Sequence, residues 1–245
     1  MAENKKPKLT PVFNLLQSAI GIWWKNLKKF LMIYVWTILY ALIPLALLVI
    51  MAALSAVGAL SQSIAFWAIL FFLGFWSFTF IIYFLVRAYL AMFLLLKHDF
   101  KRPEKEVYQE SAQYFWSYLA LMILTIILLG LWFLALVIPA IIFGVFYMFT
   151  CYAFIFEDKR DIDAVKRSYD LVKGYWWAVF GRVIFLGLIF WLFGLVIASP
   201  LRFFSSAMAF SYVWTGFMQV VNILVGPISL LLSYLIFQDL VKIKK

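Results

Sequence analysis

Few side chains in this sequence have the types and spacing that chemistry requires. The one histidine, His98, lies beside Asp99, whereas a metal site needs several His, Cys or carboxylate ligands that converge. Four carboxylates cluster at 157–163, but Lys159 and Arg160 interrupt them, and a calcium loop needs denser acids with a turn glycine. We therefore expect His98 and Asp99 to form a solvated pair and the acidic cluster to belong to a salt-bridged surface helix.

Other catalytic motifs are missing from the sequence. It contains neither a Gly-rich phosphate loop nor a G-x-S-x-G nucleophile motif. The single cysteine, Cys151, lies among aromatic residues and is expected to be a packed thiol. We expect no catalytic residues, no cofactor and no metal. An enzyme that acts on lipids is the least favoured alternative, and its candidate groups are Arg87, His98 and Glu157.

Two polar residues lie deep in an apolar run near the C-terminus. Gln219 and Asn222 are three residues apart, and Pro227 follows five residues later. Polar groups at a broken membrane helix form the binding sites of transporters, but the same groups also hydrogen-bond between packed helices. The three residues are therefore a candidate polar notch, and both interpretations stay open.

The distribution of charge predicts the elements that must position these residues. Of the 245 residues, 67% are hydrophobic and 13% are charged, against about 25% charged in soluble domains. All Asp and Glu, and all but three Lys and Arg, lie in four blocks: 1–29, 97–110, 157–173 and 239–245. Each apolar stretch between the blocks is long enough for two helices across a membrane.

We therefore expect an all-α, polytopic membrane protein with six transmembrane helices arranged as three hairpins. The expected helices are 30–54, 64–96, 114–133, 139–156, 176–198 and 207–238. Short, nearly uncharged turns should join the pairs at 55–63, 130–139 and 199–202. The chain, 1–245, is expected to be one integral membrane domain with hairpin units at about 10–96, 104–156 and 158–240.

Basic residues predict the orientation, because Lys and Arg are favoured in cytoplasmic loops. All four charged blocks lie on one side of a six-span arrangement, so both termini are expected to be cytoplasmic and Arg202 to lie outside. Arg87 and Arg182 fall near cytoplasmic helix ends, from which their side chains can snorkel. We expect no cleavable signal peptide, because the N-terminal residues are polar. Five tryptophans should form an interfacial belt: Trp23, Trp24, Trp116, Trp176 and Trp177.

A similar segment precedes each hairpin. In each, a serine lies five to eight positions before a tryptophan and an apolar span follows: the serines are Ser18, Ser111 and Ser168. We interpret the segments as amphipathic interfacial elbow helices that bend into transmembrane helices. Thr10 and Pro11 fit the N-cap and first position of the first elbow. Asp161 can cap the third elbow, and Gly174 can end it.

The stretch from 139 to 180 carries a longer pattern. An Ile-Pro pair opens the fourth span, an acidic residue follows its end, and an Ala-x-x-x-Ser-x-x-Leu-x-x-Gly motif precedes the aromatic residues. This pattern resembles the six-helix bacterial proteins related to the membrane domain of glycerophosphoryl diester phosphodiesterase. The matching residues are Pro139, Glu157, Ala164, Arg167, Ser168, Leu171, Gly174 and Trp176. Ala140 stands where the family has glycine.

The resemblance implies a multi-pass protein of the bacterial cytoplasmic (inner) membrane. It implies no hydrolase activity, because the phosphodiesterase barrel is missing from this sequence. We expect a non-catalytic membrane protein that organises lipids or partner proteins. Its expected partners are the anionic lipid headgroups at the cytoplasmic face, and either another protein or a second copy of this chain. The alternative is a transporter or channel for a small or amphipathic solute. Nucleic acid is not an expected partner, because no soluble domain carries the net charge of +10.

Overall fold

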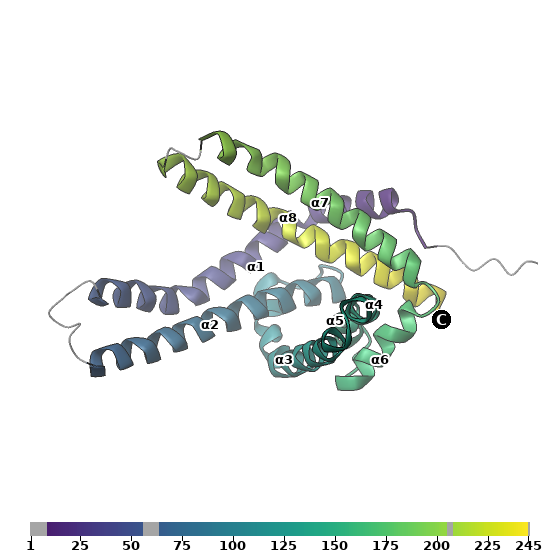
Figure 1. Ribbon diagram of the computed structural model, residues 1–245, viewed down its shortest axis with the longest axis horizontal. Coiled ribbons are helices and arrows are strands. Elements are labelled where there is room, and N and C mark those ends of the chain that lie inside the picture. The colour runs from purple at the N-terminus through teal and green to yellow at the C-terminus, as the bar shows by residue number, and fades with distance from the viewer. Residues whose placement is uncertain (1–8, 56–63, 205–207, 245) are drawn as a thin grey trace, which may run out of the picture. The chain divides into compact units, whose positions relative to one another are not determined.

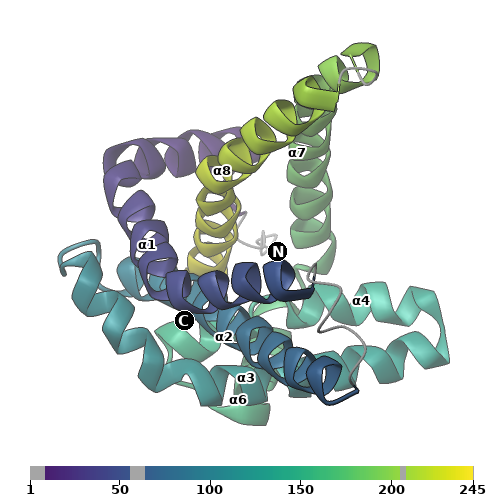
Figure 2. The ribbon, with the colours of Figure 1, turned by 90° about the vertical axis from the view of Figure 1, so that its left-hand side faces the viewer.

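The computed structural model describes residues 9–55, 64–204 and 208–244, and within these ranges the chain is all helical (Figures 1 and 2). The helices are α1 Val12–Ser55, α2 Ile64–Lys97, α3 Glu104–Ala135, α4 Val137–Tyr147, α5 Thr150–Phe156, α6 Asp161–Val172, α7 Trp176–Phe204 and α8 Met208–Ile243. Six segments of the described chain are long and apolar enough to cross a membrane: Val12–Ser55, Phe66–Lys97, Glu104–Leu134, Val137–Phe156, Trp176–Ser199 and Tyr212–Ile243. The all-helical prediction with six candidate spans is confirmed.

Large apolar side chains stay exposed along these segments. Ile43 keeps 74% of its surface exposed and Leu134 keeps 83%. Contiguous apolar surface of this extent is not stable against water, but it is the surface that a transmembrane helix presents to lipid. The chain is therefore a multi-pass membrane protein.

The helices form two compact units. One comprises Lys28–Trp116, and the other comprises Met1–Leu27 together with Ser117–Lys245. Within the first unit α1 and α2 lie side by side, and Tyr40 stacks on Phe84 with ring centroids 5.9 Å apart. Within the second unit α7 and α8 form another antiparallel pair (Figure 1). The single domain with three hairpin units stays a prediction.

Several helix ends differ from the predicted ones. The fourth span is not one helix, because a break at Met148 and Phe149 separates α4 from α5. Only Leu136 separates α3 from α4, and α7 runs on through Pro200 to Phe204. The turns predicted at 130–139 and 199–202 are therefore wrong. A proline inside a membrane helix is tolerated because nearby groups can satisfy the freed carbonyl. Most of the turn predicted at 55–63 lies outside the described residues.

The segments predicted as elbows include a separate helix in only one of the three cases. α1 and α3 each run without interruption from their first residue, so the predicted elbow residues form their first turns. In the third repeat α6 is a helix of its own, because Gly174 follows it with φ +88°. A residue in this left-handed conformation ends an α-helix. No residue of α1 or α3 has a positive φ.

Replacing Gly174 by alanine should therefore destabilise the junction between α6 and α7. No atom lies within 4 Å of the position that a Cβ would take, so the cost is conformational, at about 1–2 kcal/mol. Thermal unfolding in detergent measures the loss. Gly181→Ala is the matched control, because Gly181 lies inside α7 with the same open surroundings and alanine favours a helix there. Equal effects at the two positions would contradict this explanation.

The start of α1 is held by other helices of its unit. The Leu15 N–H donates to the Pro11 carbonyl at 3.1 Å, so the helix begins after Pro11 and Thr10 is not its N-cap. The Thr10 N–H donates instead to Oδ2 of Asp239 at 3.0 Å, and its carbonyl accepts from Nη2 of Arg182 at 2.9 Å. The N-terminal segment thus supplies acceptors for the guanidinium of Arg182, and the snorkelling of this side chain stays a prediction.

Arg87 is buried rather than snorkelled. Its side chain lies inside the Lys28–Trp116 unit with 8% of its surface exposed. Nη2 donates to the Tyr108 carbonyl at 2.7 Å and Nε to Oγ of Ser111 at 3.3 Å. The guanidinium also lies 4.6 Å from the centre of the Tyr108 ring, where a cation is attracted to the aromatic face. The serine of the second repeat is therefore a partner of this arginine.

Candidate functional site

Part of the 139–180 pattern meets the break in the fourth span. Ser168 of α6 is fully buried beside this break. Its hydroxyl donates to the Phe146 carbonyl at 2.6 Å and accepts from the Phe149 N–H at 3.1 Å. In a low-dielectric interior every backbone group needs a partner. One side chain therefore satisfies both a donor and an acceptor beside the break.

α6 presents one face to the protein and the other to solvent. Ala164, Ser168 and Leu171 are buried at i, i+4 and i+7, against α4, α5 and α8, and this spacing places them along one helix face. Asp163, Lys166 and Asp170 are exposed on the remainder. The helix begins at Asp161 with Arg160 as its N-cap residue, so Asp161 is not the cap. Its acidic first turn complements the helix dipole.

An ion pair joins the end of α5 to α6. Glu157 follows α5, and its Oε2 and Oε1 accept from Nε and Nη2 of Arg167 at 2.6 and 2.8 Å. The two side chains are 20% and 28% exposed, so water screens the pair only partly. Hydrogen bonding to Glu157 raises the pKa of Arg167, and the guanidinium stays charged throughout the neutral range. Such a two-bond geometry is stronger than a single contact.

A groove lies beside Glu157, between the end of α5 and the last turns of α8. Its volume is about 250 Å³. Its aromatic wall is Phe156, Tyr234 and Phe237, and its polar residues are Glu157, Gln238 and Lys242. We call it the Lys242 groove. Phe156 and Tyr234 pack with ring centroids 4.8 Å apart, and Nε2 of Gln238 donates to the Tyr234 hydroxyl.

The charges of the groove favour an anionic ligand. Both carboxylate oxygens of Glu157 are already bound by Arg167. Lys242 is exposed at the end of α8, and its ammonium can donate to an incoming oxygen anion. The aromatic wall offers apolar surface next to this cation. The arrangement can therefore bind a molecule that joins an anionic head to a hydrocarbon tail.

A family model described as a domain of unknown function (DUF7847) matches residues 109–240, more than half of the chain. The chain belongs to this family. No curated protein and no solved structure matches this chain. The DUF7847 region contains Ser168, the Glu157–Arg167 pair and most of the Lys242 groove, whose Val241 and Lys242 lie just beyond its end.

Tryptophans at two of the elbows anchor the DUF7847 region. Nε1 of Trp176 donates to the Ile142 carbonyl at 3.0 Å, and Nε1 of Trp23 donates to the Leu224 carbonyl at 2.9 Å. The next residue in each pair is highly exposed: Trp177 keeps 78% and Trp24 keeps 71% of its surface. Trp116 is exposed to a similar extent. The interfacial belt stays a prediction.

The candidate notch does not line a described cavity. Gln219 and Asn222 are exposed on α8, whereas Pro227 is buried. Pro139, at the start of α4, is half-buried and lies away from the Lys242 groove. The polar notch stays a prediction.

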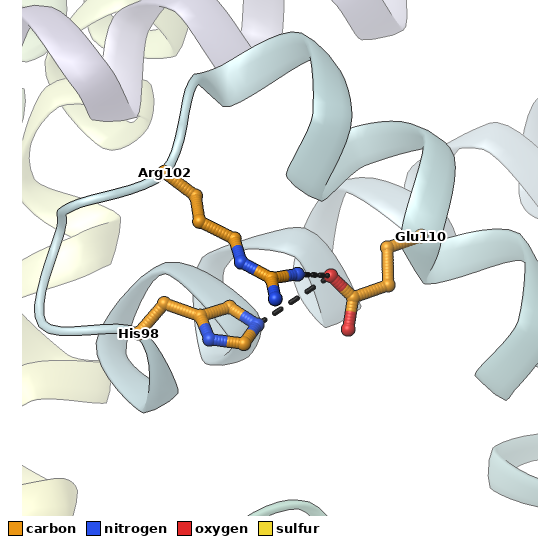
Figure 3. Close-up of polar contacts among 3 residues, drawn as sticks. All are labelled: His98, Arg102 and Glu110. Atoms are coloured by element: carbon orange, nitrogen blue, oxygen red, sulfur yellow. Dashed lines mark hydrogen bonds and ion pairs between the residues drawn. The ribbon is translucent and has the colours of Figure 1, made fainter.

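His98 lies in a small polar cluster of the Lys28–Trp116 unit (Figure 3). Figure 3 shows His98 and Arg102 pointing toward the same carboxylate. Oε2 of Glu110 accepts from Nη1 of Arg102 at 2.8 Å and lies 3.4 Å from Nε2 of His98, which makes no hydrogen bond. The predicted pair with Asp99 is therefore wrong, because the turn after α2 brings His98 to α3. Among the described residues, no three His, Cys, Asp or Glu converge as metal ligands.

Proposed function

We propose that this chain is a non-catalytic membrane protein that organises lipids, or a partner protein bound with them, at the cytoplasmic face of the membrane. The Lys242 groove carries the proposal, because it joins an exposed ammonium to an aromatic wall. The ammonium binds the phosphate of an anionic headgroup, and the wall of Phe156, Tyr234 and Phe237 packs against the acyl chain. Basic side chains near a membrane attract anionic lipid in this way.

Neighbouring charges support an anionic headgroup at this groove. Lys244 lies two residues after Lys242, and its Nζ donates to the Lys173 carbonyl. The nearby carboxylate of Asp239 accepts from the Thr10 N–H. Arg182 interacts electrostatically with this carboxylate, and Arg167 pairs with Glu157, so the charges of Lys242 and Lys244 favour a negatively charged ligand.

The orientation of the chain is part of the same proposal. Both termini lie in the cytoplasm of a bacterium, and the elbow segments lie in the headgroup layer of its inner membrane. Exposed Trp24, Trp116 and Trp177 support the elbows, because tryptophan is enriched at this depth. The 139–180 pattern supports a relation to the membrane domain of glycerophosphoryl diester phosphodiesterase.

Structural roles account for the groups that a lipid enzyme would use. Arg87 binds Tyr108 and Ser111, His98 faces Glu110, and Glu157 binds Arg167. These contacts support a non-catalytic protein, because a reacting group must be able to reach its substrate.

Replacing Lys242 by glutamine should weaken the binding of anionic lipid about fivefold, since one basic residue near the surface contributes about 1 kcal/mol. Native mass spectrometry of the full chain, purified from a mixture of phosphatidylglycerol and phosphatidylcholine, measures the lipid bound. Lys166→Gln is the matched control, because it removes the same charge from an exposed position outside the groove. Equal losses in both variants would exclude the groove as the headgroup site.

A further inference from the structure

The Lys28–Trp116 unit contains a second cavity, between the later part of α1 and the middle of α2. Its volume is about 210 Å³. The residues that define it are Tyr40, Ile43, Pro44, Trp76, Ser77 and Phe80. No Asp, Glu, Lys or Arg lines this cavity, so an ionised group would be desolvated there without a partner. The ligand that fits is uncharged.

Ser77 is the unusual residue of this cavity. Only 1% of its surface is exposed, and its Oγ is buried without a hydrogen-bond partner. Other hydroxyls in these helices donate to a carbonyl one turn earlier, as Thr37 does to Ile33 and Thr79 to Phe75. A buried hydroxyl left without a partner is destabilising. Rotation about χ1 directs it to a new acceptor at small cost.

A carbonyl that lacks its helical N–H partner lies in α1, the helix that forms the other wall. Pro44 lies inside α1 and has no N–H, so the Tyr40 carbonyl lacks the partner that a regular helix would supply. Tyr40 and Pro44 line the same cavity as Ser77. The residues that line the cavity therefore supply a carbonyl at Tyr40 and a hydroxyl at Ser77, and most of the remaining wall is apolar. A ligand hydroxyl can donate to the carbonyl and accept from Ser77.

We propose that this cavity binds a linear, uncharged alcohol of medium chain length. Its hydroxyl lies between Ser77 and the Tyr40 carbonyl, and its chain packs against Ile43, Trp76 and Phe80. An apolar cavity of about 150 Å³ accommodates benzene, so the larger volume here accepts a longer molecule. This site is independent of the Lys242 groove, because every residue that lines it belongs to the Lys28–Trp116 unit.

The test uses two photoreactive probes on the full chain in detergent: an octanol that carries a diazirine, and the matching octane without the hydroxyl. Mass spectrometry maps and quantifies the labelled peptides. In the wild-type protein the alcohol should label residues 40–47 and 73–84 about three- to tenfold more than the alkane, because it gains a hydrogen bond. Excess 1-octanol should compete for the label. Equal labelling by both probes, or labelling elsewhere, would overturn the proposal.

Two variants and a control make the assignment specific. Ser77→Ala should lower labelling by the alcohol to the level of the alkane, and an unchanged preference would overturn the role of the hydroxyl. Thr79→Ala should keep the wild-type preference, because Thr79 is exposed and bonds within its own helix. Leu73→Trp, at a partly exposed position that also lines the cavity, should abolish labelling by both probes. Persistent labelling of this variant would show that the probes bind outside the cavity.

Discussion

Replacing Ser168 by alanine is expected to lower the free energy of unfolding by about 2–4 kcal/mol, because two buried backbone groups lose their partner at once. The hydroxyl bonds the Phe146 carbonyl and the Phe149 N–H on the two sides of the α4–α5 break. Water cannot replace the lost hydroxyl, since the Ser168 side chain is fully buried. The effect should therefore exceed that of an ordinary serine substitution on a helix.

Unfolding in detergent, followed by tryptophan fluorescence and circular dichroism, measures this loss. Ser18→Ala is the matched control, because Ser18 holds the corresponding place in the first elbow but is exposed on α1. Its substitution should change stability by less than about 0.5 kcal/mol. An equally mild effect of Ser168→Ala would mean that other groups bond the Phe146 carbonyl and the Phe149 N–H. The predicted role of the Ser168 hydroxyl would then be wrong.

Separating Glu157 from Arg167 should give the second large effect. Glu157→Gln and Arg167→Gln should each cost about 1–3 kcal/mol, because each leaves a half-buried charge without its partner. The double variant should cost little more than either single one, with a coupling energy of about 1–2 kcal/mol. Because Arg167 has a raised pKa, its contribution is complete at pH values below the ordinary arginine pKa and is lost only above it. The Arg167 side of the coupling should therefore not change with pH in the neutral range.

A double-mutant cycle on unfolding free energies measures the coupling. The Arg102–Glu110 pair serves as the comparison, since half of the Arg102 side chain is exposed and such pairs contribute less than about 1 kcal/mol. Additive single effects at Glu157 and Arg167 would mean that the pair does not hold α5 to α6.

Much of the architecture was predictable from composition and charge. Confinement of the charge to short blocks predicts six apolar spans, because a segment partitions into lipid according to its own composition. The bounds of α2 were predicted within one residue, Ile64–Lys97 against 64–96. Gly174 was predicted to end the helix that precedes the fifth span, and its φ of +88° just after α6 confirms this end. These features depend on local sequence alone.

The candidate sites depended on contacts that no local pattern encodes. Ser168 belonged to a motif, but its role requires a break in another helix, and residues 145–152 contain no proline or glycine that would predict that break. Arg87 and Arg182 were expected to snorkel, and the carbonyl and hydroxyl groups of other segments that bind them were not predicted. The Lys242 groove brings residues near 157 to residues near 240. Hydropathy is a property of each segment, so the candidate membrane spans could be identified without knowledge of the fold. The partners of the polar groups could not, because a buried group takes its partner from whichever helix packs against it.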